Sequence, residues 1–385
     1  MRRESSPVRP DLAAHFEAIG FGLATIDGEP YWDESGRYVF TLDEIENRLE
    51  KASTDLVALS LELVDRVVGD EAALTRLCIP RHAWEAIAES WKRRDPSFYG
   101  RFDFAYDGHE APKLLEYNAD TPTSLYEAAV VQWYWLEQSI ERGVLPAEAD
   151  QFNSLHEKLI ERWRAIGAGR PLHLACLRAN AEDCATTDYI GECAAAAGLE
   201  TIALDMGDVG SDGHVFGDRS GRAIERLFKL YPWEWAFADE FGSSPALRQT
   251  RFVEPPWKAI LSNKGMLALA WEMAPGHPNL LPCFFEGDRG AASLARHHAR
   301  KPLFSREGAN VRLRFGDRTW DGPDDGYGAE GFVLQAFQAL PRFEGGHPVL
   351  GCWVVGDEPA GMGIREDLSP ITTDRARFVP HIILD

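Results

Sequence analysis

The sequence lacks several features that would place it outside the globular proteins. Its 385 residues contain no glycine-, serine- or proline-rich tract of the kind that forms a linker, and no uninterrupted apolar run of membrane-spanning length. Polar and acidic residues follow Arg2 and Arg3 where a secretory signal would have an apolar segment. We therefore expect one compact, cytoplasmic body of two or three lobes with no membrane partner.

Clustered cysteines and a basic stripe are also missing. The six cysteines lie far apart, which excludes a disulfide scaffold and the close cysteine pairs of a zinc site. The formal net charge is −21, and Lys and Arg are interspersed with acids, which argues against a nucleic-acid partner. Such a chain would tolerate a cationic ligand, although an acidic surface also serves solubility alone.

The remaining patterns predict a mixture of helices and sheets. Apolar residues recur at three- and four-residue steps over 42–68, which predicts a long amphipathic helix, and 123–142 has helical composition. Short apolar strands at 171–177, 201–205 and 225–231 alternate with a helix near 186–197, which predicts an α/β lobe. Strands near 299–304, 311–315, 332–337 and 348–355 predict a largely antiparallel α+β lobe. The G-x-G-x-x-G and G-x-x-x-x-G-K-[ST] signatures are absent, which disfavours Rossmann and P-loop chemistry.

A predicted hairpin carries the first candidate site. Residues 101–106 and 113–118 are separated by the turn signal Asp107-Gly108. Asp103 lies on one strand, and Glu116 and Asn118, two residues apart, point to one face of the next. Two carboxylates and an amide suit Mg²⁺ better than any Cys/His cluster would. Paired acids on a hairpin are also common surface residues, and the hairpin alone does not decide between these interpretations.

Four longer segments identify a family. EYNADTPTSLYEA (116–128), KPLFSREGANV (301–311), LPRFEGGHPVLG (340–351) and VGDEPAGMGIREDLSPIT (355–372) resemble the glutathionylspermidine synthase family of ATP-grasp acid-amine ligases. The resemblance runs from about Arg101 to the C-terminus, and it matches the synthetase part without the fused amidase domain.

The resemblance implies a glutathione synthetase-like ATP-grasp fold, α+β and α/β in class, with an α/β substrate lobe and a lid. It divides the chain into a helical region with the metal-binding hairpin (1–170), a pre-ATP-grasp substrate lobe (171–255), and the lid with the nucleotide-binding lobe (256–385). We expect small-molecule substrates, and the sequence leaves open whether the chain forms a homo-oligomer.

The same resemblance assigns roles around ATP and Mg²⁺. It makes Asp103, Glu116 and Asn118 the metal ligands, and it implies catalytic roles near the transferred phosphate for Arg101, Arg306 and Arg365. The phosphates are expected against Lys264, Lys301 and the small-residue loop that contains Glu307 and Gly308, a loop able to present backbone N–H groups. Other nucleotide contacts are expected at Phe102, Gln335, Ala336, Phe337, Gln338, Pro370, Ile371 and Thr372. Ordinary surface lysines, a plain turn and apolar core strands are the structural alternatives.

The resemblance to the family also implies which residues contact the substrates. Thr121, Thr123 and Lys229 match residues that hold the acid. Glu182 and Asp183 lie near the acidic pair that the family uses for the polyamine, although acids at a helix cap explain them equally well. The predicted reaction transfers the ATP γ-phosphate to a carboxylate, and an amine such as spermidine then attacks the acyl phosphate to form an amide. The alternatives are a related ligase for another peptide or amino acid, and a nucleotide-binding protein without activity.

Overall fold

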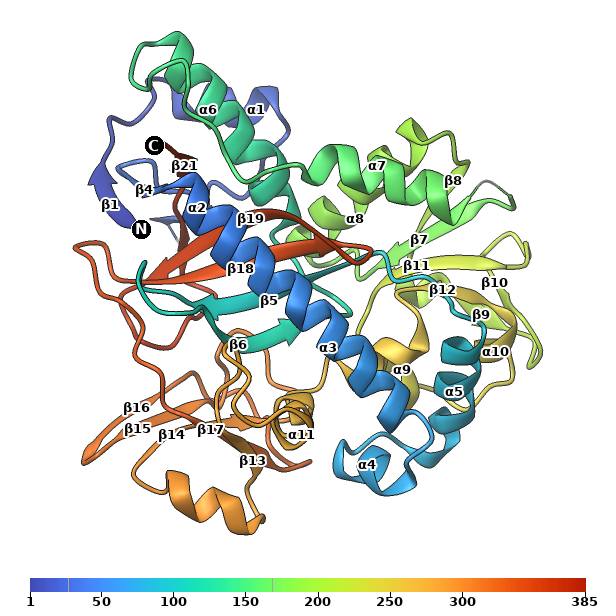
Figure 1. The fold of residues 1–385 in the computed structure, drawn as a ribbon. Helices are drawn as coiled ribbons and strands as arrows, with labels where there is room; N and C mark the ends of the chain where they lie inside the picture. The colour runs from blue at the N-terminus through green and yellow to red at the C-terminus, as the bar shows by residue number, and fades with distance from the viewer. Residues whose placement is uncertain (27, 168) are drawn as a thin grey trace.

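A computed structural model describes residues 1–26, 28–167 and 169–385. Three larger sheets organise the chain (Figure 1). The central antiparallel sheet has the order β20-β19-β18-β5-β6, formed by β5 (Tyr99–Ala105), β6 (Lys113–Asn118), β18 (His347–Val355), β19 (Glu358–Asp367) and β20 (Arg377–Phe378). The predicted hairpin is therefore present, and strands from the C-terminal part of the chain extend its sheet.

The second sheet is parallel and belongs to the predicted α/β lobe. Its order is β12-β11-β7-β8, with β7 (Leu172–Cys176), β8 (Thr201–Asp205), β11 (Arg226–Leu230) and β12 (Arg251–Val253). Helices α7 (Leu155–Ile166), α8 (Ala181–Ala196), α9 (Trp233–Ala238) and α10 (Ala246–Gln249) accompany it. The alternation of strand and helix in the sequence is thus confirmed as parallel pairing.

The third sheet is antiparallel, with the order β13-β17-β14-β15-β16. It contains β13 (Cys283–Phe285), β14 (His297–Pro302), β15 (Arg312–Phe315), β16 (Arg318–Asp321) and β17 (Phe332–Ala336), and helix α11 (Gly265–Met273) packs against β13 and β17. The segment from 256 onward therefore contributes to two of the three larger sheets, because β18, β19 and β20 join the sheet of the hairpin instead.

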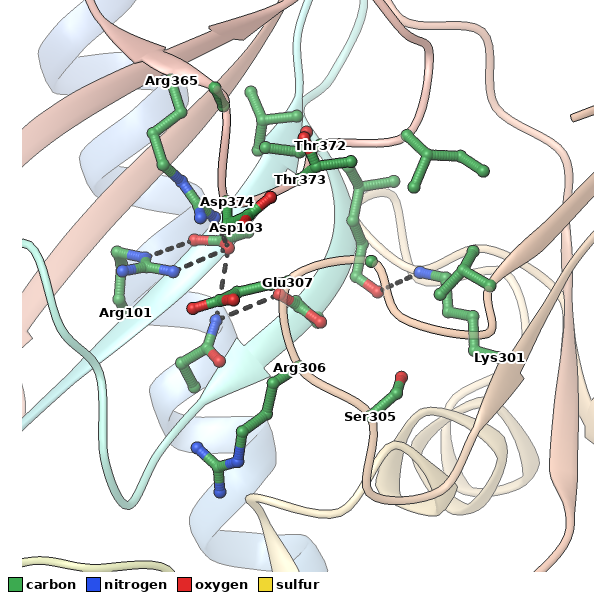
Figure 2. Close-up of a pocket in the computed structure, with 18 of the residues that line it drawn as sticks. Arg101, Asp103, Lys301, Ser305, Arg306, Glu307, Arg365, Thr372, Thr373 and Asp374 are labelled. Carbon is green, nitrogen blue, oxygen red and sulfur yellow. Dashed lines mark hydrogen bonds and ion pairs between the residues drawn. The ribbon is translucent and has the colours of Figure 1, made fainter. Parts of the chain in front are cut away.

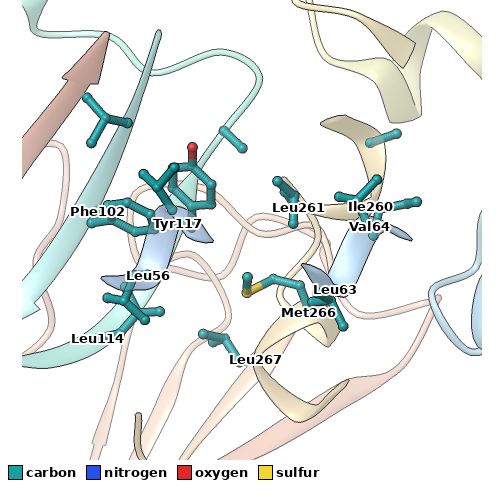
Figure 3. Packing of buried hydrophobic residues seen from close by; sticks show 14 of the residues in the cluster. Leu56, Leu63, Val64, Phe102, Leu114, Tyr117, Ile260, Leu261, Met266 and Leu267 are labelled. Carbon is teal, nitrogen blue, oxygen red and sulfur yellow. The ribbon is translucent and has the colours of Figure 1, made fainter. Parts of the chain in front are cut away.

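A long helical stretch packs across the hairpin. It runs through α2 (Leu42–Glu44), a π-helical turn (Ile45–Glu50) and α3 (Lys51–Val67), and it begins at a capping box between Thr41 and Glu44. Figure 3 shows the apolar face of α3 meeting hairpin residues on one side and the start of α11 on the other. This packing fixes the hairpin from its core face.

The remaining elements are smaller. They include a sheet of β1 (Arg2–Ser5), β4 (Gly36–Phe40) and β21 (His381–Ile383), and two-stranded pairs of β2 (Thr25–Ile26) with β3 (Glu29–Pro30) and of β9 (Gly210–Ser211) with β10 (Phe216–Gly217). The other helices are α1 (Leu12–Ala18), α4 (Glu71–Arg76), α5 (Trp84–Lys92) and α6 (Gln132–Glu141), the last preceded by a π-helical turn at Glu127–Val131. None of the helices in the described ranges is long and apolar enough to span a bilayer.

Candidate active site

A cavity of about 300 Å³ lies where the three sheets meet. The hairpin β5–β6 supplies one wall, and the β13-β17-β14-β15-β16 sheet supplies a second. The third wall is the carboxyl-terminal side of the parallel sheet, together with the start of α8 and the segment around α9. Every residue predicted for the site lines this cavity except Phe102 and Lys229. The fold therefore brings predicted site residues that are distant in the sequence together around this cavity.

Asp103 lies at the centre of the charged wall (Figure 2). Arg101 donates to its carboxylate from Nε at 2.6 Å and from Nη2 at 3.1 Å, and Arg365 donates from Nη2 at 2.9 Å. Register pairs Asp103 with Glu116 and Arg101 with Asn118 across the hairpin, so these side chains share a face. Two of the three predicted arginines, Arg101 and Arg365, thus lie beside the predicted metal ligands.

The three predicted ligands form a connected set. Nδ2 of Asn118 donates to Oδ2 of Asp103 at 3.2 Å and to Oε1 of Glu116 at 3.3 Å. An amide rotated by a half-turn would present its oxygen to the same space, so two carboxylates and one carbonyl fit Mg²⁺ there. Within the described ranges no group of three or more His, Cys, Asp or Glu side chains could hold a metal, so the set depends on Asn118.

Two lysines approach Glu116 from the opposite wall. Nζ of Lys264 lies 3.0 Å from Oε2 of Glu116, and Nζ of Lys301 donates to the carbonyl of Leu115 and to Oε1 of Gln335, both at 2.7 Å. Burial alone would raise the pKa of Glu116, but the two ammonium groups hold it well below its ordinary value. Burial lowers the pKa of Lys301 to about 8. This wall presents concentrated positive charge to the cavity.

Residues of the loop between β14 and β15, from Ser305 to Gly308, also line the cavity. Glu307, Gly308 and Asn310 all have positive φ, and a Cβ added to Gly308 would approach Ile371 and the carbonyl of Thr372 to 2.7 Å. Glycine is therefore required where the loop touches the 370–372 segment. Arg306 donates to Oγ1 of Thr121 at 3.0 Å and to Oε1 of Glu234 at 2.8 Å.

The predicted nucleotide contacts lie on both sides of this loop. Gln335 and Ala336 end β17, Phe337 and Gln338 follow this strand, and Pro370, Ile371 and Thr372 follow β19. Phe102, which was also predicted to contact the nucleotide, does not line the cavity. It is next to Asp103 in β5, and neighbouring residues of a strand face opposite sides. Its ring is fully buried and stacks on Tyr117 with centroids 4.0 Å apart, among the core residues under α3 (Figure 3).

Acidic and hydroxyl groups occupy the end of the cavity near α8. Asn180 caps this helix and accepts from the backbone N–H groups of Glu182 and Asp183, so both acids are first-turn residues as well as cavity residues. Burial, with repulsion from Glu182, raises the pKa of Asp183 to about 6. Thr121 and Thr123 line the same cavity. The two interpretations of the acidic pair are thus compatible.

Lys229 does not line the cavity, in contrast to its predicted role. Its side chain is fully buried, and Nζ donates to Oδ1 of Asp120 at 2.8 Å and to the carbonyl of Tyr231 at 2.7 Å. Asp120 also accepts from the backbone N–H of Trp233. The lysine therefore joins the segment after β6 to the start of α9, because a buried ammonium needs an anionic partner.

Several cavity residues were not predicted. They are Tyr31, Ser124, Trp235, Thr373 and Asp374, among others. Trp235 lies close to Lys229 in the sequence, and Ser124 lies within the segment that carries the resemblance. Tyr31 belongs to the first hundred residues, in which no motif pointed to the site.

Comparisons with known proteins identify the class of fold and the family. The fold is that of a mixed α/β protein of the glutathione synthetase-like class: a glutathione synthetase-like effector from Globodera pallida aligns over 97% of this chain and 96% of its own, with a TM-score of 0.59 and 11% identity. A family profile described as glutathionylspermidine synthase preATP-grasp matches residues 3–384, and the chain belongs to this family. The match thus extends across the first hundred residues too.

Individual relatives differ in length. A Haemophilus influenzae protein that carries the provisional name acid–amine ligase is 40% identical over 97% of both chains. Trypanothione synthetase of Crithidia fasciculata is 28% identical over 83% of this chain and 52% of its own. The bifunctional glutathionylspermidine synthetase/amidase of Escherichia coli is 26% identical over 93% of this chain and 60% of its own. The chain therefore spans only about half to three fifths of the last two.

Proposed function

We propose that the protein is an ATP-dependent ligase that joins a carboxylic acid to an amine. The observation that carries this proposal is the single cavity in which Asp103, Glu116 and Asn118 face Lys264 and Lys301. Oxygen ligands for Mg²⁺ next to buried cations suit the phosphates of a nucleotide. The names of the relatives, which include acid–amine and glutathionylspermidine ligases, support the same reaction class.

The proposed division of labour follows the walls of the cavity. Residues 256–385 would form an ATP-grasp unit whose 305–310 loop acts as a lid, 171–255 a substrate lobe, and 1–170 the helical region with the metal-binding hairpin. ATP would lie between the 335–338 and 370–372 segments, with its phosphates toward the hairpin. Magnesium held by the hairpin would neutralise phosphate charge during transfer.

The chain's own groups then orient the reaction. Arg101 and Arg365 hold the Asp103 carboxylate in place and add positive charge where the γ-phosphoryl group passes to the acid. The carboxylate of the acid becomes an acyl phosphate, and the nitrogen of the amine attacks its carbonyl carbon and displaces phosphate. Glu182 and Asp183 suit a cationic amine, so a polyamine such as spermidine is the proposed acceptor.

One observation favours a second candidate for the acid. The lysine expected to hold a glutathione-like peptide, Lys229, is buried and paired with Asp120. A ligase that joins a different peptide or amino acid to the amine is therefore the alternative function, with the same chemistry. ADP release measured over a panel of acids and amines, with glutathione and spermidine included, tests both. The absence of any acid- and amine-dependent ADP release would overturn the proposal.

A further inference from the structure

Arg306 links three parts of the molecule that are distant in sequence. It projects from the loop between β14 and β15, and its Nη1 atom donates to Thr121 just after β6. Its Nη2 atom donates to Glu234 in the first turn of α9 at 2.8 Å, and its guanidinium lies 5.4 Å from the ring centre of Trp235. Figure 2 shows the side chain extending away from Asp103 and Arg365. Its contacts thus differ from those of the arginines at the centre of the site.

The partner carboxylate is held firmly. The side chain of Glu234 is only 16% exposed, so its pairing with a guanidinium is better shielded than a surface ion pair. The residue before it, Trp233, donates its backbone N–H to Oδ2 of Asp120 at 2.8 Å, and Asp120 is itself paired with the buried Lys229. The start of α9 is therefore anchored, and Glu234 presents a fixed anion to a loop that contains three residues of positive φ.

We propose that Glu234 is a positioning residue that docks the 305–310 loop across the cavity by holding Arg306 beside Thr121. With the carboxylate in place, the arginine is kept on the side of the cavity where the acid would bind, and the loop covers the phosphate end. Loss of the carboxylate leaves a partly buried cation without its anion, so the loop leaves this position more often. The docking itself follows from the contacts, and its effect on turnover rests on the proposed function.

A protease test reads the docking without any substrate. Glutamyl endopeptidase cleaves after Glu307, an exposed residue of the loop. In Glu234→Gln we expect cleavage there to be about fivefold faster or more, because loss of roughly 1 kcal/mol of local stability gives such a ratio. Glu234→Asp, which keeps the charge, should restore part of the protection. Glu240→Gln changes an exposed carboxylate shortly after α9 and serves as the matched control.

Kinetics supply the second readout. If the ligase reaction proceeds, Glu234→Gln should lower kcat about tenfold or more and leave the KM for ATP within about twofold, because the other nucleotide contacts are unchanged. If Glu234→Gln is cleaved after Glu307 no faster than the unmodified protein, the inference is overturned, whatever the kinetics show. Faster cleavage with unchanged kcat would overturn the positioning role, as would a general loss of stability with faster cleavage at every site. If no ligase activity is found, the proposed function fails and the protease result still decides the docking.

Discussion

Arg365 donates a hydrogen bond to Asp103 at 2.9 Å, although strand β18 lies between their two strands in the central sheet. Arg101 pairs with the same carboxylate, so two guanidinium groups balance one acid at the proposed metal site. A cation bound there would share this carboxylate with the arginines. The proposed metal site and the proposed phosphate site therefore share their charged groups.

The first prediction concerns these charged groups. Asp103→Asn should weaken Mg²⁺-dependent ATP binding about tenfold or more, because one charged ligand is lost and two arginines are left without their partner. Isothermal titration with and without Mg²⁺ measures the effect. Glu110→Gln, in the exposed turn of the same hairpin, should behave like the unmodified protein. Equal metal-dependent affinity in Asp103→Asn would remove the hairpin from the site.

A second prediction separates catalysis from folding at Lys301. The side chain is only 7% exposed and donates two hydrogen bonds, so it is less accessible than an ordinary phosphate-binding lysine. Lys301→Met should abolish ADP release and also lower stability by about 1–3 kcal/mol, because the buried amide of Gln335 and the partly buried carbonyl of Leu115 lose their donor. Thermal melting without ligand and ADP release are the measurements. Retained turnover would exclude a role at the phosphates.

Lys229 should affect stability more than substrate affinity. Lys229→Met leaves Asp120 as an unpaired buried charge, which costs about 3–5 kcal/mol. Replacing both residues, with Asp120→Asn added, should cost less than Lys229→Met alone, because no charge is then left unpaired. Chemical denaturation measures both variants. A raised KM for the acid in Lys229→Met, with stability unchanged, would instead restore the lysine to the substrate site.

The acidic end of the cavity predicts amine selectivity. If Glu182 and Asp183 bind the amine, di- and polyamines should be preferred over monovalent or neutral amines, and added salt should reduce the preference. Glu182→Gln combined with Asp183→Asn should raise the KM for a polyamine more than the KM for ATP. The ratio of kcat/KM between spermidine and a monoamine, measured at two salt concentrations, checks this. Turnover of neutral amines alone would refute the polyamine assignment.

Glu127 predicts a dependence of stability on pH. Burial, with repulsion from Glu182, raises its pKa from 4.5 to about 7, so the folded protein keeps a proton that the unfolded chain loses. The associated stability is complete below pH 4.5 and is lost as the pH rises through 7, by about 3 kcal/mol at most. Glu127→Gln should therefore be more stable than the unmodified protein at pH 8, and this gain should disappear at pH 4.5. Thermal melting at both pH values measures the difference.

Local patterns predicted most of the elements, because turns, caps and periodicity act over a few residues. The Asp107-Gly108 turn located the hairpin, and the three- and four-residue period located α3. Pairing between strands that are distant in the sequence leaves no such pattern. Asp103 lies opposite Gly351, and nothing in the sequence of either strand indicates that the other is its partner. Long-range contacts also explain which features of the site the sequence patterns did not predict. Lys229 finds Asp120 through the fold, and Tyr31 reaches the cavity from a segment without any recognisable motif.

The strand order of the central sheet also affects synthesis of the chain. A ribosome adds about 5–20 residues each second, so β5 leaves the exit tunnel roughly 10–50 s before the strand β18 that pairs with it. During that interval the nascent hairpin has an open edge, which can pair with the strands of other chains. Helix α3 is already synthesised and can shield the apolar face of the hairpin. It cannot supply the backbone hydrogen bonds that β18 later makes to β5. Premature termination before β18 would therefore release a fragment prone to aggregate.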